Sequence, residues 1–377
     1  MPPAMNRFAI SLRVLAQGLC WACLCGMAVY AAPAPLERIV VSPDRSHFAL
    51  AGSGASFRPW GFNYDHDPAG RLLEDYWQDE WPVVERDFAA MRAFGANVAR
   101  IHLQVGRFMK SARKPDGRSL KQLARLLKLA ERTGLYLDVT GLGCYNRADT
   151  PAWYNDLDEA RRWEVQSRFW KAVAGICAGS PAVFCYDLMN EPVVSDGVKD
   201  KDWTPGEFGG KCFVQRLTLN LAGRADKQAA KAWVDKLAAA IRKHDKAGLI
   251  TVGAIPWALT WPGAKPLFYS PEVSRNLDFV SLHFYPEKGE VDKALTALAV
   301  YNIGKPVVIE EMFPLKCSVE ELNQFIDGSR HVASGWIGFY WGKSMEQYRQ
   351  DTQDPNGALT LRWLEYFVKK TPAIRGD

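Results

Sequence analysis

After residue 32 the sequence lacks any apolar run long enough to cross a bilayer. The apolar run before it, residues 14–32, follows Arg7 and Arg13 and ends in small residues, which is typical of a cleavable signal peptide. We therefore interpret residues 1–32 as a signal peptide, and expect a secreted or periplasmic protein with no stable membrane association after cleavage. An uncleaved N-terminal anchor is the alternative, whereas the residues before the cysteines in this run fit a lipid anchor poorly.

Cysteines are also few, and the net charge is small. Five of the eight cysteines follow residue 32, and this odd number without a CxxC pair argues against a disulfide framework or a zinc site. Cys177 and Cys185 fall in apolar segments that we expect in the core. A disulfide between two of Cys144, Cys212 and Cys317 is an alternative that the sequence does not exclude. The formal net charge of +5 falls to +3 without the two leader arginines, which is too mild to indicate a nucleic-acid partner.

The rest of the chain, residues 33–377, has no repeat, low-complexity tract or linker, so we expect one domain. Short apolar segments alternate with amphipathic segments, which predicts parallel strands connected by helices. Strands are expected at residues 58–64, 97–105, 135–142, 182–191, 249–255, 277–285, 305–312 and 334–342. Helices are expected at residues 83–95, 120–134, 158–179, 226–248, 291–302, 319–329 and 358–370, and the weakest helical pattern lies near residues 270–275.

Eight strand–helix units predict an α/β fold, a (β/α)8 TIM barrel that forms a single catalytic domain. An open doubly wound sheet is the alternative, but no GxGxxG motif follows a strand. Residues 39–57 have the pattern of a short β-hairpin before the first strand, and we expect this hairpin to plug the bottom of the barrel.

Polar and aromatic residues gather at the ends of most predicted strands, where barrels of this class carry their reactive groups. In strand order they are Asn63, Tyr64, Arg100, His102, Asn190, Glu191, Trp257, Trp261, His283, Tyr285, Glu310, Glu311, Tyr340 and Trp341. Glu191 and Glu311 would face each other across the barrel mouth, and paired carboxylates suit the hydrolysis of a glycosidic bond. Arg100 beside one carboxylate would keep it ionised while the other stays protonated.

Five short motifs occur in order along the predicted strands: NVARI, LMNEP, SLHFYP, KPVVIEEMF and FYWG. Together they resemble the clan-A glycoside hydrolases, and most of all glycoside hydrolase family 5, the family of cellulases and mannanases. The resemblance covers essentially all of residues 33–377, and it implies that Glu191 is the acid/base and Glu311 the nucleophile. The substrate-binding residues that it implies are Arg100, Asn190, His283, Tyr285 and Trp341, the last as a platform for a sugar ring.

Other residues are assigned by position. Asn63 and Trp257 are substrate-binding candidates because they stand at or just after predicted strand ends. Glu310 is expected to lie behind the nucleophile or to face the helix layer, since alternation along a strand puts it opposite Glu311. A register shifted by one residue would make Glu310 the nucleophile instead. Thr140 stands where the family often has a histidine, which puts the lining beside the reacting sugar in doubt.

The prediction from the sequence is a secreted retaining glycosidase that hydrolyses O-glycosidic bonds of a β-linked glucan or mannan by double displacement. Its partner is the carbohydrate substrate, the mechanism needs no metal or cofactor, and we expect a monomer. The long Gly-rich loop at residues 195–213, which contains Trp203, is expected to wall the substrate cleft. Two alternatives on the same fold are a carbohydrate-binding pseudoenzyme and a transglycosylase, in which a sugar replaces water as the acceptor.

Overall fold

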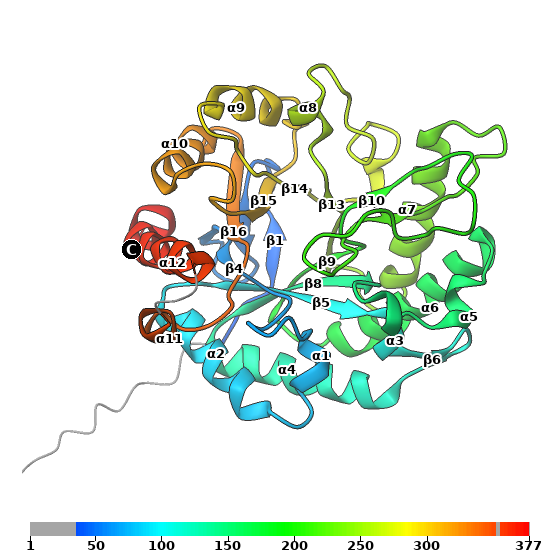
Figure 1. Ribbon diagram of the computed structural model, residues 1–377, viewed down its shortest axis with the longest axis horizontal. Coiled ribbons are helices and arrows are strands. Elements are labelled where there is room, and N and C mark those ends of the chain that lie inside the picture. The colour runs from blue at the N-terminus through cyan, green and yellow to red at the C-terminus, as the bar shows by residue number, and fades with distance from the viewer. Residues whose placement is uncertain (1–34, 352–354, 377) are drawn as a thin grey trace, which may run out of the picture. The chain divides into compact units, whose positions relative to one another are not determined.

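The computed structural model describes residues 35–351 and 355–376 (Figure 1), so the predicted signal peptide at residues 1–32 lies outside the described residues. Within these two ranges, no helix combines the length and the apolar character that a membrane crossing requires.

Nine parallel strand segments form one sheet whose two edges belong to the same stretch of chain. The order is β12, β9, β8, β5, β4, β16, β15, β14 and β13, and only Val252 separates β12 (Leu249–Thr251) from β13 (Gly253–Ala254). The sheet therefore closes as eight strands, which confirms the predicted (β/α)8 barrel and excludes the doubly wound sheet. The other strands of the barrel are β4 (Trp60–Tyr64), β5 (Val98–Gln104), β8 (Tyr136–Gly143), β9 (Val183–Asp187), β14 (Val280–His283), β15 (Val307–Met312) and β16 (Ala333–Gly338).

Helices surround the strands in Figure 1, as the alternating pattern predicts. The main ones are α2 (Trp81–Ala93), α4 (Gly117–Thr133), α6 (Glu159–Cys177), α7 (Asp226–Arg242), α9 (Val291–Ala299), α10 (Val319–Ser329) and α12 (Pro355–Arg375). Local sequence sets their ends: Asp116 caps α4 by accepting hydrogen bonds from the first turn, and Gly134 ends it with a φ of 74°. Between helix and barrel the packing is aromatic, and Phe367 of α12 stacks on Trp60 of β4 with ring centroids 4.3 Å apart.

Short elements fill the connections. The helices among them are α1 (Leu73–Tyr76), α3 (Val105–Phe108), α5 (Ala152–Asn155), α8 (Trp257–Thr260) and α11 (Met345–Gln350), with 3-10 turns at Arg147–Asp149 and Ser274–Asn276. The strands among them are β6 (Met109–Ser111), β7 (Lys114–Pro115), β10 (Pro192–Val193) and β11 (Gln215–Arg216). The region near residues 270–275, which had the weakest helical pattern, contains only the second of these 3-10 turns.

Several predicted strands are shorter in the structure, and the fourth and fifth differ in ways that shape the site. The fourth ends at Asp187, not at Glu191, and Glu191 has a φ of 46°, outside the extended region. The fifth is divided at Val252 because the hydroxyl of Tyr269 bonds to the Val252 carbonyl and also accepts a hydrogen bond from the Ser281 amide at 2.8 Å. A side chain therefore replaces the neighbouring strand at this point of the barrel.

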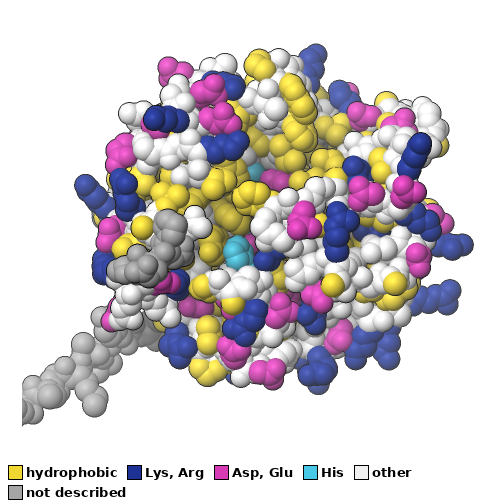
Figure 2. Space-filling view, in the orientation of Figure 1, with side chains coloured by type: hydrophobic (Ala, Val, Ile, Leu, Met, Phe, Trp, Pro, Cys, Tyr) yellow, Lys and Arg dark blue, Asp and Glu magenta, His cyan; other side chains and the backbone are white. Residues whose placement is uncertain are grey.

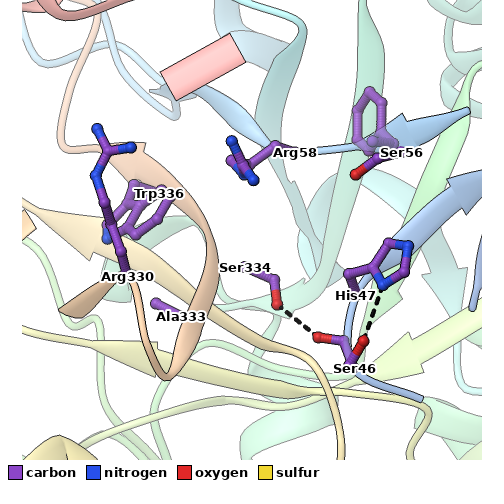
Figure 3. Close-up of a pocket in the computed structure, with 9 residues that line it drawn as sticks. Ser46, His47, Ser56, Arg58, Arg330, Ala333, Ser334 and Trp336 are labelled. Carbon is purple, nitrogen blue, oxygen red and sulfur yellow. Dashed lines mark hydrogen bonds between the residues drawn. The ribbon is translucent and has the colours of Figure 1, made fainter. Parts of the chain in front are cut away.

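The predicted plug is present as a small antiparallel sheet of β1 (Ile39–Val41), β2 (Phe48–Leu50) and β3 (Ser56–Phe57), so the hairpin gains a third strand. Phe48 is fully buried and packs edge-on against Phe184 and Phe279, both 5.2 Å away, at the starts of barrel strands. The Ser334 hydroxyl donates to the Ser46 carbonyl at 3.2 Å and joins the plug to β16 (Figure 3). The plug closes the barrel at the end opposite the carboxyl ends of the strands.

Candidate active site

A cleft of about 570 Å³ lies at the carboxyl ends of the strands and contains Asn190, Glu191, Tyr285 and Glu311. Figure 2 shows it as a hollow with largely hydrophobic walls. The apolar and aromatic residues of its walls are Pro205, Phe208, Phe213, Val214, Phe313, Leu315, Phe339, Tyr340 and Leu359. The predicted loop therefore does wall the cleft, although Trp203 itself is buried and donates its indole N–H to the Asn155 carbonyl.

Glu191 and Glu311 meet over one histidine on the floor of the cleft. The Nδ1 of His283 lies 2.9 Å from Glu191 Oε1 and 3.5 Å from Glu311 Oε2. A carboxyl oxygen of Glu191 and one of Glu311 lie within 4.8 Å of each other. Burial lowers the pKa of His283, but the charge of Glu311, the hydrogen bond to Glu191 and the carboxylate of Glu310, 3.5 Å away, outweigh burial and raise that pKa to about 10. His283 is therefore an imidazolium at neutral pH and contacts the carboxyl groups of both Glu191 and Glu311.

Arg100 ties four side chains of the site together. Its Nη1 donates to Asn63 Oδ1 at 2.8 Å and to Glu311 Oε1 at 2.6 Å. Its Nη2 donates to Asp187 Oδ2 at 2.8 Å and to Asn190 Oδ1 at 2.9 Å. Since the guanidinium is fully buried, these bonds fix the orientation of each partner rather than merely neutralising it.

Glu311 is held from two sides as an anion. Tyr285 donates its hydroxyl to Glu311 Oε2 at 2.7 Å, opposite the bond from Arg100 to Oε1. Burial raises the pKa of Glu311, and the positive charges of His283 and Arg100 partly offset that rise. Glu191, His283 and Glu311 have donor atoms that could hold a metal ion, but the Arg100 charge at Glu311 disfavours a cation there.

Around this centre a second set of polar side chains fixes Asn63 and Asp187. Asn63 Oδ1 accepts a bond from His102 Nε2 at 3.0 Å, while the other ring nitrogen, Nδ1, lies 2.6 Å from the Tyr145 hydroxyl. Burial and the charge of Arg100 lower the pKa of His102 well below its usual value, so His102 is neutral. Thr140, at the position of the expected histidine, donates its hydroxyl to Asp187 Oδ2 at 2.9 Å and does not line the cleft.

Glu310 lies behind Glu311, the first of its two expected positions, and points into the barrel instead of toward the helix layer that simple alternation favours. Its pairing explains this, because the register of β15 with β16 shifts between Ile309 and Met312. Glu310 is fully buried beneath the cleft, and its Oε2 lies 3.5 Å from both Arg100 Nη2 and His283 Nε2. Of the two adjacent carboxylates, only Glu311 lines the cleft.

Of the seven predicted substrate-binding residues, only Asn190 and Tyr285 line the cleft. Asn63, Arg100 and His283 are buried beneath it. Arg100 and His283 contact residues that line the cleft, and Asn63 accepts a hydrogen bond from Arg100.

The other two predicted residues, Trp341 and Trp257, are not brought to the cleft. Trp341 is fully buried and packs against Phe62 and Phe94, because β16 ends at Gly338 and strand alternation no longer applies beyond it. Phe339 and Tyr340 line the cleft instead. Trp257 begins α8 and stacks on Trp261 with ring centroids 4.9 Å apart, and neither ring is part of the lining.

Three polar residues of the site were missed from the sequence: Asp138, Tyr145 and Asp187. A signal existed for the two aspartates, because each interrupts an otherwise apolar strand, in LYLDVT and VFCYDLM. Tyr145 follows β8 by two residues and gave no signal of its own. Among the described residues the five cysteines are all free, so no two of Cys144, Cys212 and Cys317 form a disulfide in this structure.

Known proteins share this architecture and sequence pattern. The family model "Cellulase (glycosyl hydrolase family 5)" matches residues 61–343. The mannan endo-1,4-β-mannosidase A of Podospora anserina is 24% identical over 319 residues, which span 78% of this chain and 72% of that protein.

Solved structures agree on the fold. An exo-β-1,4-mannosidase, Op5Man5 from Opitutaceae bacterium strain TAV5, matches with a TM-score of 0.66 and 17% identity over 89% of this chain. This chain spans only 63% of that longer protein. The catalytic domain of Thermobifida fusca endoglucanase Cel5A matches with a TM-score of 0.56 and 17% identity, over 88% of this chain and 97% of that domain. The family model covers most of the chain, and the chain therefore belongs to glycosyl hydrolase family 5, as a glycosidase that hydrolyses O-glycosyl bonds.

Proposed function

We propose that the protein is a secreted, retaining glycosidase that cleaves β-mannosidic bonds of a β-1,4-linked mannan or its oligosaccharides. The observation that carries the retaining mechanism is the approach of Glu191 and Glu311, whose nearest carboxyl oxygens lie within 4.8 Å. Retaining enzymes hold their carboxyl groups about 5–5.5 Å apart, whereas inverting enzymes need about 6.5–9.5 Å to admit a water. Mannan is the first choice because two of the similar proteins are named as mannosidases, and β-glucan is second because another is named as an endoglucanase.

In the first step Glu311 attacks the anomeric carbon while Glu191 gives its proton to the leaving oxygen. The bond from the anomeric carbon to the leaving sugar breaks as the bond to the Glu311 oxygen forms. The bonds from Arg100 and Tyr285 hold the attacking carboxylate in place. Asn190, oriented by Arg100 and by its own bond to the Phe213 carbonyl, is placed to bind a hydroxyl of the same sugar.

In the second step Glu191, now a carboxylate, takes a proton from a water molecule. The water oxygen bonds to the anomeric carbon and displaces Glu311, so two inversions restore the original configuration. A sugar hydroxyl in place of water would give the transglycosylase that the sequence left open. The signal-peptide pattern at residues 1–32 supports export, and N-terminal sequencing of the exported protein would test it.

The test compares wild type, Glu191→Gln and Glu311→Gln on β-mannans, β-glucans and aryl β-glycosides. We expect Glu311→Gln to lose activity on every substrate. Glu191→Gln should lose about 10²–10⁴-fold on polysaccharide and much less on aryl glycosides, whose leaving group needs no proton. Added azide should then give a β-glycosyl azide with Glu191→Gln and an α-glycosyl azide with Glu311→Gln.

The matched control is Glu320→Gln on the exposed face of α10, which should behave as wild type. A first product of inverted configuration, measured by proton NMR, would contradict the retaining mechanism. Binding without turnover by wild type would support the pseudoenzyme. Full activity of Glu311→Gln would show that another residue is the nucleophile.

A further inference from the structure

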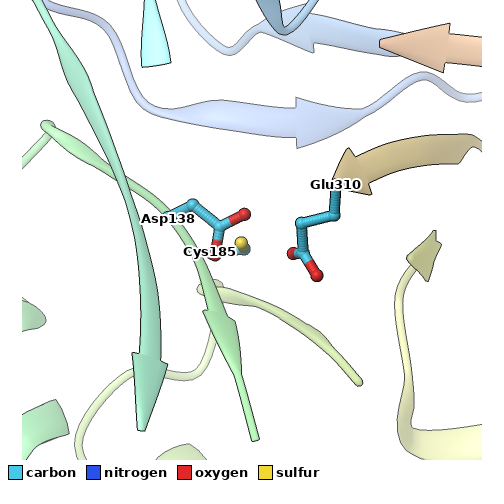
Figure 4. Close-up of side chains that lie close together, drawn as sticks. All are labelled: Asp138, Cys185 and Glu310. Carbon is cyan, nitrogen blue, oxygen red and sulfur yellow. The ribbon is translucent and has the colours of Figure 1, made fainter. Parts of the chain in front are cut away.

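Beneath the cleft floor, three buried side chains from three strands converge inside the barrel: Asp138 of β8, Cys185 of β9 and Glu310 of β15 (Figure 4). One polar atom of each lies within 4.8 Å of the others, and all three side chains are fully buried. Within the described part of the chain, no N–H or alcohol group donates a hydrogen bond to any of the four carboxylate oxygens of Asp138 and Glu310. Two adjacent carboxylates buried in the core cannot both stay charged without compensation.

The charged neighbours of the pair are distributed unevenly. Glu310 Oε2 lies 3.5 Å from the guanidinium of Arg100 and 3.5 Å from the imidazole of His283. Asp138 has no ion pair among the described residues. The titratable groups that act on the pair from the surrounding strands and loops are Arg100, His102, Cys185, Asp187, Tyr269, His283 and Glu311. The charge of Glu310 is thus compensated by two cations at 3.5 Å, whereas, within the described residues, a charge on Asp138 would have no ion pair and only the more distant Arg100 acting on it.

We propose that Asp138 and Glu310 share one proton, carried by Asp138, and that Glu310 is a positioning residue that acts on the catalytic carboxylates through His283. Asp138 as a carboxylic acid donates to a Glu310 oxygen, which gives Glu310 a donor and removes the charge from Asp138. The glutamate stays anionic and receives the Nε2–H of His283. The charge of Glu310 thereby helps to keep His283 an imidazolium, and its second N–H, at Nδ1, donates toward Glu191 and Glu311.

The electrostatics of the cluster agree with this assignment. Burial, and then the charge of Glu310, raise the pKa of Asp138 well above its usual value. Burial alone would also raise the pKa of Glu310, but the Arg100 charge and the imidazole of His283, 3.5 Å away, lower it below its usual range. The Cys185 thiol, with its pKa raised chiefly by burial, stays protonated.

The backbone of β13 leaves room for this arrangement at Gly253. A Cβ on Gly253 would lie 2.6 Å from Glu310 Oε2, 2.8 Å from His283 Nε2 and 2.9 Å from Arg100 Nη2. The absent side chain is what lets three charged groups meet beneath the cleft. A divalent cation on Asp138, Cys185 and Glu310 would instead sit beside the charge of Arg100, which argues for the proton.

The first test detects the protonated carboxyl group directly and does not depend on catalysis. Infrared difference spectra of the full chain at neutral pH, wild type minus Asp138→Asn, should show the C=O stretch of one carboxylic acid. Histidine NMR should show His283 as an imidazolium to well above pH 8 in wild type and titrating at least one pH unit lower in Glu310→Gln. A missing acid band in wild type, or an unchanged His283 titration in Glu310→Gln, would overturn the proposal.

The second test concerns the reaction, and it rests on the proposed glycosidase function. Asp138→Asn keeps an N–H that can donate to Glu310, so kcat/KM and its pH profile should stay within about threefold of wild type. Asp138→Val removes the donor and should lower kcat more than tenfold with little change in KM. In Glu310→Gln the pH profile should gain an ionisation from His283 that wild type lacks. Equal loss in Asp138→Asn and Asp138→Val would contradict the shared proton, whereas no turnover by wild type would count against the proposed function alone.

Discussion

At the scale of single residues, Arg100 is the centre of the site. A fully buried guanidinium is favourable only when good hydrogen-bond partners replace water, and Arg100 has Asn63, Asp187, Asn190 and Glu311. The four partners come from three other strands or their ends, so one side chain sets the relative positions of groups far apart in the sequence. The same residue therefore contributes to stability and to the geometry of the nucleophile.

We predict that Arg100→Lys lowers the free energy of unfolding by about 3–5 kcal/mol, the usual cost of breaking a buried ion pair. An ammonium cannot reach four partners in two directions, so at least two acceptors lose the hydrogen bond that Arg100 donates. Urea unfolding measures the loss. Arg349→Lys, at an exposed arginine that pairs with Glu365, is the control and should change stability by less than about 0.5 kcal/mol. Equal stability of the two variants would contradict the central role of Arg100.

At the scale of elements, the small β1–β3 sheet replaces the solvent that would otherwise reach the bottom of the barrel. Phe48 of β2 is its main contact, since its ring meets Phe184 and Phe279 and is fully buried. The catalytic groups lie at the other end of the strands, so stability and activity can be separated here.

We expect Phe48→Ala to lower the free energy of unfolding by about 3–5 kcal/mol because it leaves a cavity under the barrel. Phe48→Leu, which fills most of that space, should cost less than half as much. Urea unfolding measures both, and kcat/KM of the folded fraction should stay within about twofold of wild type. A large loss of activity at full folding would show that the plug also shapes the cleft.

Element types and order were predictable from the sequence because each barrel strand is apolar and each outer helix carries one apolar face. The motif glutamates were predictable as well, since strand order brings the carboxyl ends together at one mouth. The orientation of Glu310 was not, because it depends on a register shift of β15 that alternation cannot show. Trp341 was misplaced for a related reason, since it follows the end of β16 and turns away from the cleft.

At the scale of the whole molecule, buried acids with raised pKa values make the free energy of unfolding depend on pH. Burial raises the pKa of Glu74 in α1 to about 7, and burial together with the charge of Glu310 raises the pKa of Asp187 to about 6. A carboxyl group with a raised folded pKa binds more protons in the folded state than in the unfolded state between the two pKa values. Its contribution to stability is therefore complete below the unfolded pKa and is lost as pH rises through the folded pKa.

Glu74 offers the clearest test, because it lies outside the catalytic cluster and accepts a hydrogen bond from the Gln104 amide at the end of β5. Glu74→Gln mimics the protonated acid and does not titrate. Between pH 4.5 and 7 we expect wild type to lose about 3 kcal/mol relative to this variant, with the loss complete near pH 8. Urea unfolding of both proteins across this pH range measures the difference, with exposed Glu320→Gln as the control. A difference that is constant with pH would show that Glu74 has the same proton affinity folded and unfolded, and a difference of opposite slope would show that it is held as an anion.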